Sequence, residues 1–275
     1  MTRMTWKDAA RVAVALSATH GLTPEARAAA PYGAAVVAYT PGAGATPGYT
    51  NPASALGEPS RFIADPNFPG AVTPFNAPYL PEQVVSIGAG GSLTLAFEQP
   101  VLDDPMNPFG IDLLVFGNSF FFDPITFEPI ARAISADGGT VEVSADGQTW
   151  FLVPGAQADG LFPTLGYVDV TDPYSSPAGV VPTDFTRPVD PGFAWLGADL
   201  ATLVAGYNGS GGGAGIDLAS VGLASASFVR LSLAAGGGGA GNIEIDAVSD
   251  VSPVPAPGVA AVGVLALASR RRRRA

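Results

Sequence analysis

The chain has 275 residues, of which 24 are acidic and 13 basic, giving a formal net charge of −11. It contains one histidine and no cysteine, which excludes a disulfide framework, a zinc finger and a cysteine nucleophile. Hydrophobic residues make up 47% of the chain, enough for the core of one large all-β domain or two small ones. Between residues 31 and 269 there are 22 acidic residues, four arginines and no lysine. This balance argues against a nucleic-acid partner and suits either divalent cations or solubility alone.

The first 30 residues have the pattern of a secretory signal peptide. Positive charges at Arg3, Lys7 and Arg11 precede a short apolar stretch at residues 12–16, and an A-x-A cleavage pattern follows at residues 28–30. A disordered leader or a misassigned start codon is the alternative. The signal-peptide interpretation predicts that the protein is exported.

The body, residues 31–252, has a β pattern throughout. It lacks a long apolar repeat of 3.6 residues, and turn residues separate its short β-like runs. Strands are predicted at 34–39, 84–87, 92–97, 111–116, 140–144, 149–153, 166–170, 227–233 and 243–248, and one helix at 198–207. The spacing predicts an all-β fold, an antiparallel β-sandwich with long Gly/Pro-rich loops.

The segment 140–153 is the clearest local element. Val141 and Val143 alternate with polar residues, and the pair Asp146 and Gly147 marks a hairpin turn before Trp150. This stretch resembles the Ser-x-Asp-Gly-x-x-Trp hairpin of discoidin and galactose-binding-like jelly rolls, and it differs by one residue from the sialidase Asp-box. The resemblance implies a jelly-roll-like sandwich, with Trp150 in the core.

The residue inventory removes most catalytic mechanisms. His20, the only histidine, lies in the predicted leader, so the exported chain has no His or Cys for a catalytic triad or for a His-ligated metal. There is no lysine beyond Lys7, which excludes a P-loop despite the glycine runs at 209–215 and 236–241. Carboxylate chemistry remains, because a glycosidase needs only two acids. Its candidates are Asp112, Glu128, Asp217 and Glu244.

The same acids could instead bind calcium, because calcium is coordinated by carboxylate, amide and backbone oxygens. Three places combine acids with glycine or with tight backbone: Asp103 and Asp104 with Asn107, Gly110 and Asp112; Asp217 after Gly215; and Glu244 with Asp246. The predicted calcium ligands are Asp104, Asp112, Asp217, Glu244 and Asp246. Solvent-facing acids or turn caps are the alternative. A structural calcium near one edge of the sandwich is also what the galactose-binding resemblance implies.

Aromatic residues in the predicted loops could stack on a sugar ring. The candidate ligand-binding residues are Tyr174, Phe185 and Trp195, which lie in the long, proline-rich irregular stretch from residue 174 to 195. Phe120 to Phe122 and Tyr207 are further candidates for the same role, and burial in the core is the alternative for all of them.

The C-terminal segment, residues 253–275, has three parts. Pro255, Ala256 and Pro257 precede an uncharged apolar run at 259–269, and five arginines follow: Arg270, Arg271, Arg272, Arg273 and Arg274. The apolar run is predicted to be a short helix of about 17 Å, shorter than the roughly 30 Å hydrocarbon core of a bilayer. The arginines would hold the C-terminus on the cytoplasmic side. A basic nucleic-acid tail would leave the apolar run unexplained.

This tail resembles the PEP-CTERM sorting signal, which a membrane protease, exosortase, recognises. Alanine replaces the glutamate of the Pro-Glu-Pro motif in this chain. The resemblance implies an exosortase-like partner, a membrane tether before processing, and delivery to the cell surface or extracellular matrix. The predicted function is a non-catalytic surface or matrix protein that binds calcium or polysaccharide. The alternative is a carboxylate-dependent polysaccharide hydrolase.

Overall fold

A computed structural model describes residues 30–174, 178–236 and 241–251. These residues form mainly antiparallel β-sheets, which confirms the all-β prediction. Almost all of the predicted leader and the whole of the sorting segment 253–275, including its apolar helix, lie outside the described residues. Within the described ranges, no helix is long and apolar enough to cross a membrane.

The larger sheet has five strands in the order β1-β5-β12-β9-β10. Their bounds are β1 (Gly33–Thr40), β5 (Ser92–Leu102), β9 (Thr140–Ser144), β10 (Phe151–Leu152) and β12 (Ser225–Ser232). The predicted hairpin is present, because β9 and β10 pair antiparallel around the turn at Asp146 and Gly147. Asp146 holds this turn by accepting bonds from the backbone N–H groups of Gln148 and Thr149, at 2.8 and 2.7 Å.

The second sheet has four strands in the order β11-β6-β13-β4. Their bounds are β4 (Val85–Gly88), β6 (Leu113–Gly117), β11 (Ala214–Ile216) and β13 (Asn242–Asp250). The apolar faces of the two sheets contribute to one core cluster. Leu95, Val143 and Leu231 enter it from the larger sheet, and Val115 and Ile245 from the smaller one. Most of these side chains follow the two-residue period from which the strands were predicted.

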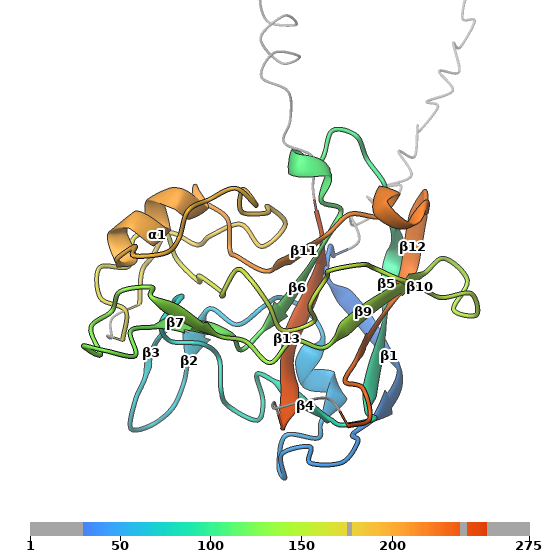
Figure 1. The fold of residues 1–275 in the computed structure, drawn as a ribbon, viewed down its shortest axis with the longest axis horizontal. Coiled ribbons are helices and arrows are strands. Elements are labelled where there is room, and N and C mark those ends of the chain that lie inside the picture. The colour runs from blue at the N-terminus through green and yellow to red at the C-terminus, as the bar shows by residue number, and fades with distance from the viewer. Residues whose placement is uncertain (1–29, 175–177, 237–240, 252–275) are drawn as a thin grey trace, which may run out of the picture.

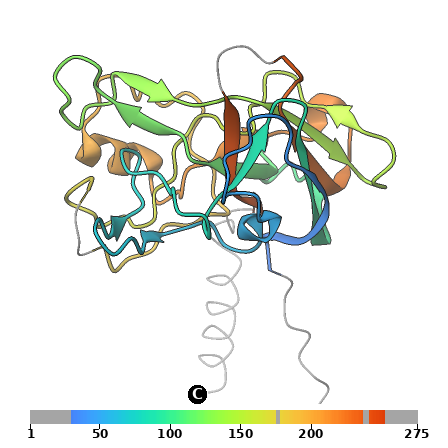
Figure 2. The ribbon, with the colours of Figure 1, turned by 90° about the horizontal axis from the view of Figure 1, so that it is seen from below.

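The remaining elements form a second region to one side of these sheets (Figures 1 and 2). It contains the pairs β2 (Phe62–Ile63) with β3 (Gly70–Ala71) and β7 (Phe120–Phe122) with β8 (Ala133–Ser135), together with the helix α1 (Leu200–Tyr207). The helix confirms the one that was predicted, and Asp199 caps it by accepting a bond from the N–H of Thr202 at 2.9 Å. Its buried side chains, Leu200, Leu203 and Tyr207, pack in a separate core with Phe121.

Three single turns of 3-10 helix complete the described elements: η1 (Pro52–Ala55), η2 (Pro108–Gly110) and η3 (Ala219–Val221). The strand predicted at 166–170 is absent. That segment makes a single bridge, from Tyr167 to Pro182, and a proline has no N–H with which to extend the ladder.

Trp150 also differs from its predicted position. It is only half-buried, and the guanidinium carbon of Arg230 lies 4.1 Å from the centre of its ring. The hairpin therefore places this ring on the outer face of the sheet beside an arginine, where a cation–π contact takes the place of core packing.

The two ends of the described body meet. The N–H of Asp250 donates to the carbonyl of Pro31 at 2.6 Å, and Tyr32 bridges to Ser249. The N–H of Val251 donates to the carbonyl of Asp112 at 2.9 Å. The chain thus enters and leaves this body at one end, beside Asp112.

Candidate cation site

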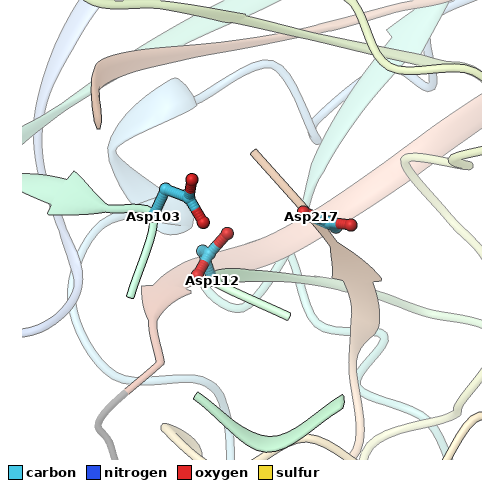
Figure 3. Close-up of side chains that lie close together, drawn as sticks. All are labelled: Asp103, Asp112 and Asp217. Atoms are coloured by element: carbon cyan, nitrogen blue, oxygen red, sulfur yellow. The ribbon is translucent and has the colours of Figure 1, made fainter. Parts of the chain in front are cut away.

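Three aspartates come together at this end of the molecule. Asp103 follows β5, Asp112 precedes β6, and Asp217 follows β11. Each offers a carboxylate oxygen, and the three oxygens lie within 4.8 Å of one another. Figure 3 shows the carboxyl groups of Asp103 and Asp112 facing one another, with Asp217 beside them. We call these three residues the acidic triad.

Strand pairing explains why the triad forms. Strand β11 pairs antiparallel with β6, and Ile216 lies opposite Leu113, so the residues just outside that pair are neighbours. These residues are Asp217 and Asp112. Asp103 arrives from the larger sheet, where β5 ends at Leu102. The triad therefore lies where strand ends from both sheets meet.

Asp112 is fully buried and organises the backbone around it. Its Oδ1 accepts bonds from the N–H of Asp104 at 3.2 Å and from Nδ2 of Asn107 at 2.8 Å, and its Oδ2 accepts one from the N–H of Leu218 at 2.9 Å. Burial raises the pKa of Asp112, and these hydrogen bonds oppose that rise. Asp112 is thus both a member of the triad and the anchor for the loops beside it.

The other two carboxylates are more open. Asp217 is half-buried, and its Oδ1 accepts bonds from the N–H groups of Ala219 at 2.8 Å and Ser220 at 3.3 Å. Its Oδ2 faces Gly110, because a β-carbon placed on Gly110 would lie 4.0 Å from this oxygen. Asp103 is exposed, and no described residue donates to its carboxylate. Both residues therefore have an oxygen available to a cation.

Asn107 contacts the triad through its amide nitrogen, and its amide oxygen has no partner within the described part of the chain. The side chain is buried, with 6% of its surface exposed, and its Nδ2 is used by Asp112. Its Oδ1 is the buried side-chain atom without a hydrogen-bond partner among the described residues. Burying a polar atom without a partner is unfavourable, so an unpartnered oxygen on a residue bonded to the triad calls for an explanation. Amide and carboxylate oxygens together are a ligand set that suits calcium.

The structure brings together part of the predicted calcium set. Asp112 and Asp217 meet as predicted, but the third acid is Asp103 instead of Asp104. Asp104 instead accepts a bond from the N–H of Met106 at 2.8 Å, which holds a turn. Sequence alone could not decide between these two neighbours, because the choice depends on how the chain turns after Leu102.

Glu244 and Asp246, the other predicted ligands, lie on β13 apart from the triad. Asp246 is buried and accepts bonds from the N–H of Ser60 at 2.7 Å and from its hydroxyl at 2.9 Å. Glu244 lies instead near two acids that were not predicted as site residues, Asp137 and Asp159. Asp137 precedes β9 and Asp159 follows β10. The sequence pattern did not indicate that these two acids lie near Glu244.

These buried acids have strongly raised pKa values. Burial, opposed by bonds from Ser60, raises the pKa of Asp246 to about 7. Burial also raises the pKa of Asp159 to about 7, and the charges of Asp137 and Glu244 add to the rise. The pKa of Glu244 reaches about 7 through burial and the charge of Asp137. The protein therefore holds several carboxyl groups that ionise near neutral pH.

The three predicted ligand-binding aromatics have different environments. Phe185 is 1% exposed and contacts Phe116 edge-on at 5.3 Å, so its burial corrects the expectation that it faces a ligand. Trp195 is half-buried and stacks on Phe121 at 4.7 Å. Tyr174 is exposed. The structure therefore does not gather the three into one binding surface.

Comparisons with known proteins add no assignment, because no protein-family model and no curated protein matches the chain.

Proposed function

We propose that this protein is an exported, non-catalytic component of the cell surface or extracellular matrix, with a β-sandwich that binds a calcium ion at the acidic triad. The calcium site rests on the meeting of three carboxylates, together with the unpartnered Oδ1 of Asn107, whose amide nitrogen is bonded to Asp112. Calcium would use the oxygens that Asp103 and Asp217 leave open and would offset the repulsion between the acids.

The sandwich is supported by the common core. Apolar side chains from β5, β9 and β12 pack in one cluster with side chains from β4, β6 and β13. Two antiparallel sheets that share one core are the arrangement expected of a jelly-roll-like sandwich. The triad would then lie at one end of the sandwich and link strand ends from both sheets.

Sorting through the tail is supported by the sequence of residues 253–275, with its Pro-Ala-Pro motif, apolar run and arginine cluster. We infer that an exosortase-like membrane protease recognises this segment and that the membrane holds the protein before processing. Expression beside such a protease tests this step. Replacing the five arginines with glutamine should leave the chain unprocessed and change its cellular location.

Thermal melting tests the calcium site. The purified protein would be treated with a chelator and then melted across a calcium titration, with magnesium in parallel. Binding to the folded state should raise the melting midpoint until the site is saturated. The gain in unfolding free energy is about 2.7 kcal/mol at a hundredfold excess over Kd. A midpoint that calcium does not move would overturn the proposal.

Neighbouring acids provide a matched control. Asp103→Asn and Asp217→Asn should remove most of the calcium-dependent shift, because each replaces an open carboxylate of the triad. Asp104→Asn makes the same charge change one residue away from Asp103 and should keep the shift, because its side chain holds a turn. Equal loss in all three variants would indicate general screening of negative charge instead of a site.

A second candidate function is a carboxylate-dependent polysaccharide hydrolase, and Glu244 favours it. Glycosidases pair a protonated acid with an ionised one, and Glu244 has a pKa of about 7, raised by burial and by the charge of Asp137. Release of reducing ends from polysaccharide, abolished by Glu244→Gln, would support this function and displace the non-catalytic proposal. If the wild-type protein releases no reducing ends, the hydrolase function is excluded.

A further inference from the structure

An open hollow of about 210 Å³ lies between residues 75–79 and the start of strand β7. Its lining includes three aromatic rings and two amides: Phe75, Tyr79, Phe120, Asn76 and Asn118. Phe120 is also one of the aromatic residues that the sequence suggests for stacking on a sugar, and none of the five belongs to the acidic triad. Aromatic rings combined with amides are groups that can bind a sugar, because its ring has apolar C–H faces and a rim of hydroxyls.

We propose that this hollow binds one neutral sugar ring of a polysaccharide chain. In this arrangement the ring of Phe120 packs against the sugar face, and the amides of Asn76 and Asn118 form hydrogen bonds with its hydroxyls. This inference does not rest on the calcium site, and either can fail without the other.

The walls of the hollow are held in place before any ligand binds. Thr73 and Asn76 exchange backbone hydrogen bonds at 3.1 and 2.9 Å, which fixes the turn. The N–H of Phe121 donates to the carbonyl of Pro74 at 2.7 Å, which joins the turn to β7. The hydroxyl of Tyr49 donates to the carbonyl of Tyr79 at 2.8 Å. A preformed site loses little conformational entropy on binding.

Strand β7 presents its aromatic rings on opposite faces. Phe121 is fully buried, whereas Phe120 is 37% exposed and Phe122 is 36% exposed. The rings of Phe120 and Phe122 lie 6.0 Å apart, but only Phe120 lines the hollow. Phe120 therefore has a ring face open to a ligand and a fixed backbone behind it.

The amides supply the polar contacts. Nδ2 of Asn76 donates to the carbonyl of Ala71 at 2.9 Å, which orients the side chain, and no described residue donates to its Oδ1. Asn118 is half-buried and lies close enough to Glu244 to lower the pKa of that acid. One amide thus offers a free acceptor, and the other links the hollow to the acids behind it.

Charge and size select the kind of sugar. The lining has no basic side chain, and Glu244 lies behind Asn118, so a sugar acid would be repelled. The hollow is smaller than the roughly 300 to 1,000 Å³ typical of pockets that enclose a whole ligand. It suits a single ring that remains part of a polymer outside.

Affinity electrophoresis of the full protein tests this proposal, with hydroxyethyl cellulose, galactomannan or polygalacturonate cast into native gels. At least one of the two neutral polymers should retard the wild type, and the acidic one should not. Phe120→Ala should weaken retardation roughly tenfold, which corresponds to about 1.4 kcal/mol. Asn118→Ala should weaken it as well. Phe122→Ala removes an equally exposed ring outside the hollow and should keep most of the retardation.

Circular dichroism would show that each variant is folded. Two results would overturn the proposal directly: no retardation by either neutral polymer, or retardation by polygalacturonate alone. Equal loss in Phe120→Ala and Phe122→Ala would also overturn it, because it would indicate general adsorption to exposed rings. Retardation that persists with chelator present would show that the sugar site is independent of calcium.

Discussion

Asp112 shows how one buried carboxylate can organise several parts of a fold. It accepts hydrogen bonds from Asp104 and Asn107 in the loop between β5 and β6, and from Leu218 in the segment after β11. Its own carbonyl accepts the N–H of Val251. A residue chosen from the sequence as a calcium ligand is therefore also a structural anchor. Its substitution cannot report on calcium alone.

This double role gives a prediction about stability without calcium. Asp112→Ala leaves three donors without an acceptor, two of them backbone N–H groups, and should lower the free energy of unfolding by about 2 to 4 kcal/mol in the presence of chelator. Asp112→Asn keeps one acceptor oxygen and should cost less. Urea denaturation measures both. Asp104→Ala is the control, because it removes the acceptor of only one turn. If Asp104→Ala lowers the free energy of unfolding as much as Asp112→Ala does, this account is contradicted.

At the scale of elements, strands with a regular apolar alternation were predictable from the sequence. Strand β9 has the predicted bounds, because Val141 and Val143 point to the core whatever lies beyond them. The short strands β2, β3, β7, β8 and β11 were not predicted. In β7 only Phe121 points inward, and three residues are too few to show a period. Such strands exist because of contacts with distant parts of the chain, such as the bond from Phe121 to Pro74.

The candidate site was predictable to the same extent. The glycines before Asp112 and Asp217 marked these two acids as candidates in the sequence. The choice of Asp103 over Asp104, in contrast, required the path of the chain after β5. The hollow beside β7 could not be foreseen, because the turn that forms one wall meets β7 through contacts distant in sequence.

The pairing of β9 with β12 gives a second prediction. Glu142 lies opposite Arg230, and the two side chains form a two-bond ion pair at 2.7 and 2.6 Å, with Arg230 also against Trp150. Because both side chains are partly exposed, we expect a coupling energy of about 0.5 to 1 kcal/mol in a double-mutant cycle.

Arg230→Lys keeps the charge but loses the planar group, so it should recover less than half of that coupling. The fluorescence of Trp150 should change in Arg230→Lys and remain nearly unchanged in Glu142→Gln. A coupling near zero would show that water already satisfies both groups.

At the scale of the whole molecule, the buried acids predict an unusual dependence of stability on pH. Asp159, Asp246 and Glu244 have pKa values raised to about 7 in the folded state, mainly by burial. Between about pH 4 and 7 the folded protein therefore binds more protons than the unfolded chain. The free energy of unfolding should fall as pH rises through this range.

Acids with lowered pKa values limit the stability of the fold at low pH. Hydrogen bonds from Thr149 and Gln148 lower the pKa of Asp146 to about 2, and its contribution is lost as pH falls below about 4. Denaturation in chelator should therefore give maximal stability at about pH 4. Asp246→Asn should flatten the decline toward pH 7. Stability that increases from pH 5 to pH 7 would contradict the raised pKa values.

The meeting of the two ends of the described body beside Asp112 determines how this body would carry mechanical load. A pull on residue 251 enters β13, which lies between β6 and β4 and is bonded to both. Tension along that strand acts on many ladder bonds together, so they resist in parallel instead of opening one at a time. Under the proposed function, an ion at the acidic triad would reinforce this point of entry, and calcium would then set the force at which the body yields when it is held through its C-terminal tail.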